Sequence, residues 1–133
     1  MYMDLPFEST EAAYQAAKSP HPCQMTFFIG LRPYESKKLG RKISIRRDWE
    51  QIKISIMMEI LRIKFQQPKY KELLLSTGNM ILEEGNYWKD YFWGICPEGS
   101  ENGKNMLGHC LMEIREELTR GVQWVSLTVT VTR

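Results

Sequence analysis

The chain has 133 residues, of which 43% are apolar, and a formal net charge of +2 at pH 7. This length and apolar content suffice for one hydrophobic core, so we expect a single domain over residues 1–133. No apolar run approaches the roughly 20 residues that cross a bilayer, and no signal-peptide pattern opens the chain. The composition therefore argues against membrane residence and secretion and predicts a cytoplasmic protein. The small net charge does not by itself indicate nucleic-acid binding.

Three cysteines, Cys23, Cys96 and Cys110, lie far apart along the chain. An odd number at irregular spacing is typical of free thiols in a reducing compartment. Neither His21-x-Cys23 nor His109-Cys110 has the spacing of zinc ligands, and no Cys-x-x-Cys occurs. We expect no metal site. A cysteine nucleophile is not expected either, because Cys110 falls inside a predicted helix.

The first predicted element is a short helix over residues 9–18. Ser9 or Thr10 can cap it, and alanines fill its body. At about 100° per residue, three polar side chains fall within roughly 60° of one another: Glu11, Gln15 and Lys18. The first-turn position of Glu11 lets the helix dipole stabilise its anion. A merely solvated polar face would show the same pattern.

A long helix is predicted over residues 48–67, after a buried strand or core-lining loop over residues 25–31. Asp48 is its expected cap. Its apolar stripe consists of Trp49, Ile52, Ile56, Met57, Ile60 and Leu61. Lys53 projects into this stripe, where its ammonium either snorkels to water or reaches a buried anion or a substrate.

Residues 37–47 contain six cations: Lys37, Lys38, Arg41, Lys42, Arg46 and Arg47. A solvated basic surface is the ordinary interpretation of such a cluster. A phosphate-binding rim is the functional alternative, and it would suit a pyrophosphate or a nucleic-acid backbone equally well.

An aromatic run with one carboxylate follows a helix predicted over residues 70–75 and a brief extended segment over residues 79–84. It includes Trp88, Asp90 and Trp93. Such rings can stack on a planar base or nicotinamide beside a carboxylate. The ordinary alternative is that the rings fill a core.

The last predicted helix covers residues 104–118 and buries Leu107, Leu111, Ile114 and Leu118. Arg115 borders that apolar face, either as the partner of a buried charge or as a phosphate clamp. Residues 122–131 are β-branched and partly alternating, which predicts an edge strand or hairpin partner. Such a strand could pair two copies of the chain as a homodimer. The elements together predict a mainly α fold with a few short β-strands, of the α+β class.

Several of these segments resemble motifs of the NADAR, or YbiA-like, family. Residues 11–18 resemble its Thr-x-Glu-His-x-x-Gln-x-x-Lys helix, and residues 90–94 resemble its Asp-x-x-Trp-Gly motif. Residues 103–115 resemble its Gly-x-Asn-x-Leu-Gly-x-x-Leu-Met-x-x-Arg helix. Further blocks follow in the family's order: Lys37 to Arg41, Trp49 to Lys53, Ile60 to Phe65 and Leu74 to Gly78.

The resemblance covers about residues 7–118 and implies a compact, single-domain YbiA-like fold. Two features depart from the family pattern. Ala12 stands where histidine is common, and only Met1 to Pro6 precede the glutamate helix, where relatives have a Phe-x-Ser-Asn-Phe-type segment.

The function implied by the resemblance is that of a metal-independent N-glycosidase without a cofactor. Its substrates would be ADP-ribosylated guanine or ribosylamine intermediates of riboflavin synthesis. Cleavage through an oxocarbenium-like state requires that charge at C1 is stabilised and that departure of the base is eased. Glu11 fits charge stabilisation or activation of water. Asp90 fits the other carboxylate role or the orientation of a ribose hydroxyl, and Lys18 could hold a phosphate or form a Schiff base with ring-opened C1.

Substrate-binding roles follow from the same resemblance. Trp93, with Trp88 or Tyr91 in support, would stack on the base, and Asn105 would bond to ribose or base edges. The Lys37-to-Arg41 block coincides with a family motif, so we favour phosphate recognition there. The remaining expected binding residues are Gln15, Lys53 and Arg115.

Two other functional classes remain open. One is a module that binds ADP-ribose or NAD without turnover, which the short segment before the glutamate helix favours. The other is an interaction protein that recruits a partner through residues 122–131.

Overall fold

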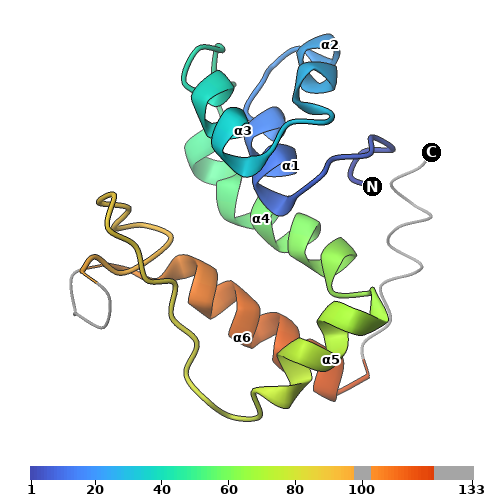
Figure 1. The fold of residues 1–133 in the computed structure, drawn as a ribbon, viewed down its shortest axis with the longest axis vertical. Coiled ribbons are helices and arrows are strands. Elements are labelled where there is room, and N and C mark those ends of the chain that lie inside the picture. Colours follow the sequence, from blue (N-terminus) through green and yellow to red (C-terminus); the bar gives the residue numbers. More distant parts are fainter. Residues whose placement is uncertain (98–102, 122–133) are drawn as a thin grey trace. The chain divides into compact units, whose positions relative to one another are not determined.

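Figure 1 shows the fold in a computed structural model that describes residues 1–97 and 103–121. The chain divides into two compact units, one comprising Met1–Lys64 and the other beginning at Phe65. The described helices are α1 (Thr10–Ala17), α2 (Pro22–Met25), the 3-10 helix η1 (Thr26–Phe28), α3 (Pro33–Gly40), α4 (Trp49–Lys64), α5 (Pro68–Ser76) and α6 (Met106–Thr119). The predicted mainly helical fold is confirmed for these residues.

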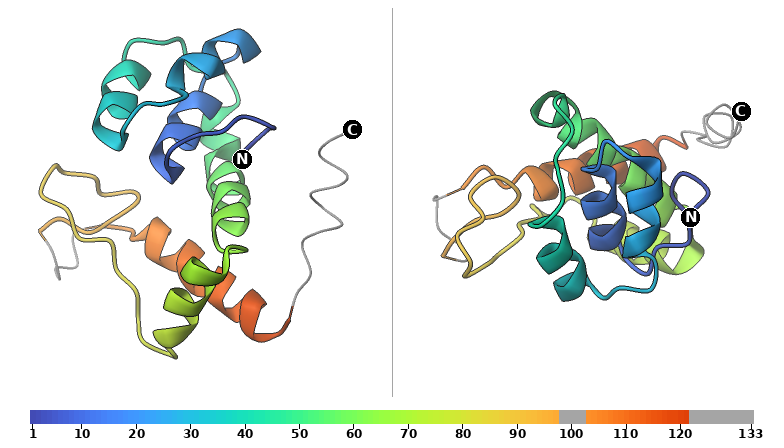
Figure 2. Two further views of the ribbon diagram at one scale, coloured as in Figure 1. Left: turned by 45° about the vertical axis from the view of Figure 1, so that its right-hand side comes forward. Right: turned by 90° about the horizontal axis from the view of Figure 1, so that it is seen from above.

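The first unit is built around α1. The Ser9 hydroxyl oxygen accepts a hydrogen bond of 3.1 Å from the backbone N–H of Ala12, which is the predicted N-cap. All four alanines of α1 are buried, so that α3 and α4 can pack closely on the helix. The Tyr14 ring meets Trp49 of α4 edge-on, with centroids 5.0 Å apart. Both views in Figure 2 show α3 beside α1.

Prolines begin three of the helices, because the first helical position needs no N–H donor. Pro33 therefore starts α3, whereas the sequence pattern at Arg32-Pro33 predicts only a turn. The Glu35 carboxylate in the first turn accepts a hydrogen bond of 2.8 Å from the backbone N–H of Arg32, which precedes α3. Lys37 and Lys38 consequently lie on a helix, and Arg41 is its C-cap residue.

A strand, which is one of the two structures expected for residues 25–31, does not form there, and residues 79–84 form none either. Residues 25–28 are helical, at the end of α2 and in η1, because Pro22 starts a helix that carries the chain through Met25. Residues 79–84 form no ladder, since the neighbouring described pairing is an isolated parallel bridge between Gly85 and Ile95. Within the described residues the few β-strands of the expected α+β class are thus reduced to isolated bridges. The strand predicted over residues 122–131 lies outside the described part of the chain.

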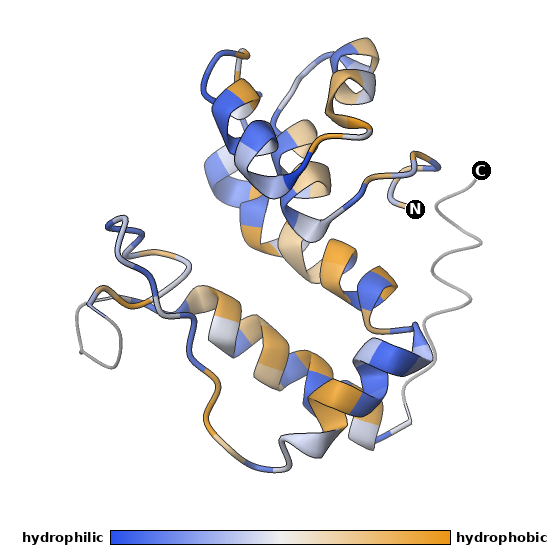
Figure 3. Ribbon diagram, in the orientation of Figure 1, coloured by the Kyte–Doolittle hydropathy of each residue, from blue (hydrophilic) through white to orange (hydrophobic). Residues whose placement is uncertain are grey.

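The long helices carry mixed apolar and polar surfaces, as Figure 3 shows for α4 and α6. In α4 the buried residues are Trp49, Met57, Met58, Ile60 and Leu61, whereas Ile52 and Ile56 are half-buried. In α6, Ile114 is fully buried, but Leu107, Leu111 and Leu118 are only half-buried, in contrast to the predicted stripe. No helix in the described ranges has both the length and the apolarity needed to cross a bilayer.

The second unit packs α5 against α6. The Arg115 guanidinium on α6 donates a hydrogen bond of 2.8 Å to the Thr77 hydroxyl at the end of α5. That hydroxyl donates in turn to the Leu74 carbonyl oxygen at 2.6 Å. Arg115 therefore fastens the end of α5 to α6.

Candidate functional site

The polar face of α1 is organised by one short hydrogen bond. The Gln15 side-chain amide donates to the Glu11 carboxylate, with 2.7 Å between Nε2 and Oε1. The two residues are four apart, which is the helical spacing at which side chains meet. Because a carboxylate only accepts hydrogen bonds, this contact also fixes which way the amide of Gln15 points.

The carbonyl oxygen of Gln15 points the other way, toward α3. Only 7% of Gln15 is exposed, and its Oε1 has no hydrogen-bond partner among the described residues. A Cβ on Gly40 would overlap this oxygen and lie 3.0 Å from Cδ, so a larger residue there would require the amide to move. A buried acceptor without a donor costs about 1–3 kcal/mol. The oxygen is therefore enclosed between α1 and α3 without a donor.

Ser36 gives a second unpartnered buried group on α3. It lies four residues before Gly40, on the same helix face, and is fully buried. Its hydroxyl oxygen also lacks a hydrogen-bond partner within the described residues. Sequence reasoning missed Ser36, because a lone serine in a basic stretch carries no periodic signal.

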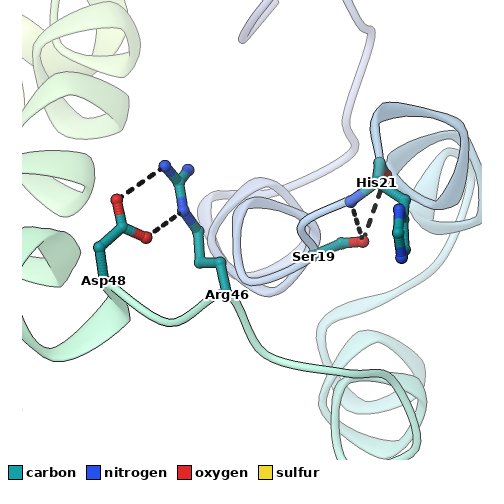
Figure 4. A network of polar contacts seen from close by, with 4 residues as sticks. All are labelled: Ser19, His21, Arg46 and Asp48. Carbon is teal, nitrogen blue, oxygen red and sulfur yellow. Dashed lines mark hydrogen bonds and ion pairs between the residues drawn. The ribbon is translucent and has the colours of Figure 1, made fainter.

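Lys18 lies at the C-terminal end of α1. Its ammonium stands 5.5 Å from the centroid of the Tyr14 ring, a cation–π contact. Its backbone carbonyl accepts a hydrogen bond of 2.8 Å from the N–H of Arg46, which ties the segment between α3 and α4 to the end of α1. Just beyond, the Ser19 hydroxyl accepts a 3.1 Å hydrogen bond from the N–H of His21 and closes the turn after the helix (Figure 4).

Arg46 is in turn held by Asp48, as Figure 4 also shows. Its Nε and Nη2 donate to Oδ1 and Oδ2 at 2.7 and 3.0 Å. These hydrogen bonds lower the pKa of Asp48 and raise that of Arg46. Asp48 does precede α4 as predicted, and its backbone carbonyl accepts from Ile52 at 3.2 Å. Its carboxylate, however, is directed to Arg46.

The other candidates of the first unit lie on α3 and α4. Lys37 is half-buried, and Arg41 is exposed at the C-terminal end of α3. The Lys53 side chain is only 15% exposed, and its ammonium lies 2.7 Å from the carboxylate of Glu50. The structure thus gives Lys53 an acidic partner on its own helix, and its role toward a substrate stays a prediction.

In the second unit, Asp90 organises the turn that carries the aromatic run. Its Oδ1 accepts hydrogen bonds from the backbone N–H groups of Phe92 and Trp93 at 3.2 and 2.9 Å. Asn86, fully buried, clamps the Asp90 backbone from both sides, donating to its carbonyl and accepting from its N–H, each at 3.0 Å. In the sequence, Gly85-Asn86 indicates only a turn and gives no sign that Asn86 is buried.

The aromatic side chains on this turn differ in exposure. Trp93 is half-buried and meets Phe92 edge-on at 4.8 Å between centroids. Trp88 and Tyr91 are 59% and 48% exposed. The turn therefore offers exposed ring surface beside one ring that is already packed.

Asn105 connects the segment before this turn to α6. It has a left-handed backbone with φ of 50° at the N-cap position. Its Oδ1 accepts from the N–H of Glu84 at 2.9 Å, and its Nδ2 donates to the Leu82 carbonyl at 2.8 Å. Glu84, which the sequence patterns did not single out, also accepts a 3.2 Å bond from Asn86. The side chain of Asn105 thus binds the backbone of Leu82 and Glu84. A role of Asn105 at a ribose or base edge stays a prediction.

Comparison with known proteins identifies the class. The NADAR domain family model matches residues 2–119. The chain therefore belongs to the NADAR domain family, as its motifs predict.

Curated relatives match this chain over only part of their own length. "N-glycosidase YbiA" of Escherichia coli (strain K12) is 39% identical over 89 residues, which is 65% of this chain and 54% of that protein. "Riboflavin biosynthesis protein PYRR, chloroplastic" of Arabidopsis thaliana is 39% identical over 92 residues, 64% of this chain and 15% of that protein. The chain thus spans about half the length of its YbiA relatives.

The fold is also similar to a solved structure. The NMR structure of E. coli YbiA aligns with a TM-score of 0.75 and 31% sequence identity. The alignment covers 86% of this chain and 69% of that chain. The YbiA-like fold expected from the sequence motifs is therefore confirmed.

Proposed function

We propose that this chain is an N-glycosidase that hydrolyses the bond between ribose C1 and the nitrogen of a base or amine. Membership of the NADAR family and the similarity to relatives named N-glycosidase YbiA support this activity. The observation that carries it is the Glu11–Gln15 pair, a carboxylate held at 2.7 Å by an amide whose other end is buried and unpartnered. The proposed substrates are ADP-ribosyl or ribosylamine compounds.

In the proposed reaction, Glu11 acts on the water or on C1. As the C1–N bond breaks, its electron pair leaves with the nitrogen, and positive charge develops on the ribose ring. The Glu11 carboxylate stabilises that charge, or it accepts a proton from the water whose oxygen bonds to C1. The departing nitrogen then takes up a proton. Both routes need a carboxylate that is held in place, which the hydrogen bond from Gln15 provides.

Gln15 is then a positioning residue, because its side-chain amide holds the Glu11 carboxylate. Lys18, at the end of the same helix, would bind a phosphate or form a Schiff base with ring-opened C1. Lys37 and Arg41 would bind phosphate oxygens, and Lys53 and Arg115 would support the substrate indirectly through the contacts described above.

For the second unit we propose that Asp90 and Asn105 hold the aromatic turn and its neighbouring segment in shape. The side chains of both residues accept hydrogen bonds from backbone N–H groups. Trp93 and the exposed Trp88 would supply the ring surface on which a base stacks. A direct carboxylate role for Asp90 is the alternative, and it predicts loss of turnover in Asp90→Asn without loss of stability.

The test is mass-spectrometric detection of a released base. The panel contains NAD, ADP-ribose, a ribosylaminopyrimidine phosphate and ADP-ribosylated guanine in DNA. Wild type should release a free base from at least one compound, and Glu11→Gln should not. Glu8→Gln is the matched control, because it removes an exposed carboxylate three residues earlier.

Two results would count against the proposal. Turnover that survives in Glu11→Gln removes Glu11 from the mechanism. Absence of turnover on the whole panel, together with a ligand-induced rise in Tm, would instead favour a module that binds ADP-ribose or NAD without hydrolysis.

A further inference from the structure

The part of the aromatic turn that carries Trp93, residues 90–94, is bound on one side by the N-terminal end of α6. The Phe92 carbonyl oxygen accepts a hydrogen bond of 3.0 Å from the N–H of Met106, the first residue of α6. The Trp93 carbonyl oxygen accepts one of 3.0 Å from the N–H of Leu107, the second residue. These N–H groups have no partner within their own helix. The turn therefore satisfies them, and its backbone is fastened to a rigid element.

The other side of this segment is held by Asn86, which is fully buried. Its Nδ2 donates to the Asp90 carbonyl oxygen at 3.0 Å and to Glu84 Oε2 at 3.2 Å. Its Oδ1 accepts from the Asp90 N–H at 3.0 Å. A side-chain amide has two N–H donors, so both donors of Asn86 are used. Because hydrogen bonds in a protein interior are electrostatically stronger than in water, this one side chain fixes the backbone of Asp90.

The same side chain reaches the backbone on both sides of Trp93. Before Trp93, Asp90 transmits the constraint, since its Oδ1 accepts from the Trp93 N–H at 2.9 Å. After Trp93, Gly94 has no room for a side chain. A Cβ there would overlap Oε2 of Glu84 and lie 2.6 Å from Nδ2 of Asn86. Asn86 thus acts before Trp93 through Asp90, and after it by packing directly on Gly94.

The Trp93 ring gains from a backbone that is already ordered. The ring is half-buried and packs edge-on against Phe92, so part of its surface stays exposed for stacking. The rotamers open to a side chain depend on its backbone dihedral angles, so a fixed backbone narrows the orientations of the ring. Ordering a mobile side chain when a ligand binds lowers the affinity by about 2- to 12-fold. A ring ordered in advance avoids this loss.

We propose that Asn86 is a positioning residue that acts through Asp90 and Gly94 to hold the Trp93 ring where an aromatic base stacks on it. This inference rests on the proposed function, in which Trp93 supplies the ring surface. Its consequence is a specificity. Asn86 strengthens the binding of compounds that carry an aromatic base on ribose C1 and leaves the binding of the ribose phosphate itself unchanged. A residue that only stabilised the fold would affect both kinds of compound equally.

The experiment compares two probes that differ in the base, adenosine monophosphate and ribose 5-phosphate. Isothermal titration calorimetry measures the Kd of each probe for a parent protein, for Asn86→Ala and for Thr77→Val. All three proteins also carry Glu11→Gln, which prevents hydrolysis of the nucleotide during the titration. Thr77→Val is the matched control, because it removes two hydrogen bonds of the same unit at the end of α5. Asn86→Ser is measured in parallel and takes the place of Asn86→Ala if alanine prevents folding.

A spectroscopic measurement follows the ring directly. In protein labelled with fluorotryptophan, fluorine NMR gives a separate signal for each tryptophan, and Trp93→Phe identifies the signal of Trp93. The parent should show one narrow Trp93 signal that shifts when adenosine monophosphate binds. In Asn86→Ala this signal should broaden or split, because the ring samples several orientations.

Asn86→Ala should weaken the binding of adenosine monophosphate by about 2- to 12-fold and leave the Kd of ribose 5-phosphate unchanged. Thr77→Val should leave the ratio of the two Kd values as it is in the parent. The inference is overturned if Asn86→Ala weakens both probes equally, if the parent does not prefer the probe with the base, or if the Trp93 signal is the same in Asn86→Ala as in the parent.

Neither measurement depends on turnover, so the two proposals can fail separately. A base-dependent effect of Asn86→Ala in a chain whose wild type releases no base would refute the glycosidase alone. Release of a base by wild type, without a base-dependent effect of Asn86→Ala, would refute the positioning role alone.

Discussion

Replacing Gly40 by alanine should destabilise this protein, although alanine is the better helix former. In an open helical position the exchange would stabilise by roughly 0.5–1 kcal/mol. Here the new Cβ would overlap Gln15 Oε1 and lie 3.0 Å from Cδ, so the amide of Gln15 must move. That movement breaks its 2.7 Å hydrogen bond to Glu11.

The magnitude follows from these two effects. A hydrogen bond to a charged group contributes about 1.5–3 kcal/mol, and overpacking a close contact costs about 1–3 kcal/mol. Set against the gain in helix propensity, Gly40→Ala should lower the free energy of unfolding by about 1.5–5.5 kcal/mol.

The sign should reverse once the amide is gone. In Gln15→Ala the nearest remaining atom of residue 15 is Cβ, 3.5 Å from the position of the new methyl group, which is an ordinary contact. Gly40→Ala in that background should therefore stabilise slightly. Urea unfolding of wild type, both single variants and the double variant measures the coupling. Equal destabilisation by Gly40→Ala in both backgrounds would refute the account.

Three further predictions concern other residues. Asn105→Ala should lower the free energy of unfolding by about 3 kcal/mol, because it removes two hydrogen bonds and leaves alanine with about 1 kcal/mol of strain in a left-handed backbone. Asn105→Gly should lower it by about 2 kcal/mol, because glycine adopts that backbone without strain. Urea unfolding measures the difference between the two variants. Asp90→Ala should lower the free energy of unfolding by about 2 kcal/mol, because Asp90 Oδ1 no longer accepts hydrogen bonds from the backbone N–H groups of Phe92 and Trp93. Asp90→Asn keeps an acceptor oxygen, so its Tm should be close to that of wild type. Burial raises the pKa of Glu59, so the folded chain holds that proton more tightly than the unfolded chain and stability falls as the carboxyl ionises with rising pH. Glu59→Gln should accordingly raise Tm at pH 7 and lose this advantage at pH 3, and a Tm gain that is independent of pH would contradict the assignment.

Local sequence determined helix α1 and the pairing within it. The Ser9 cap, the buried alanines and the four-residue spacing of Glu11 and Gln15 all act over a single turn or two, and the structure has each of them as expected. The motifs also identified the family, because their order along the chain is a property of the sequence and does not depend on how the chain packs.

Tertiary structure decided what the polar groups do. Gln15 needs Gly40 on another helix to leave room for its amide, and Asn105 reaches Leu82, which lies 23 residues away in the sequence. The sequence likewise could not decide whether residues 79–84 form a strand, because a strand requires a partner along its length and no periodic pattern within one segment can tell whether that partner is there. Contacts within one helical turn are encoded by spacing, whereas contacts between elements depend on how the whole chain packs.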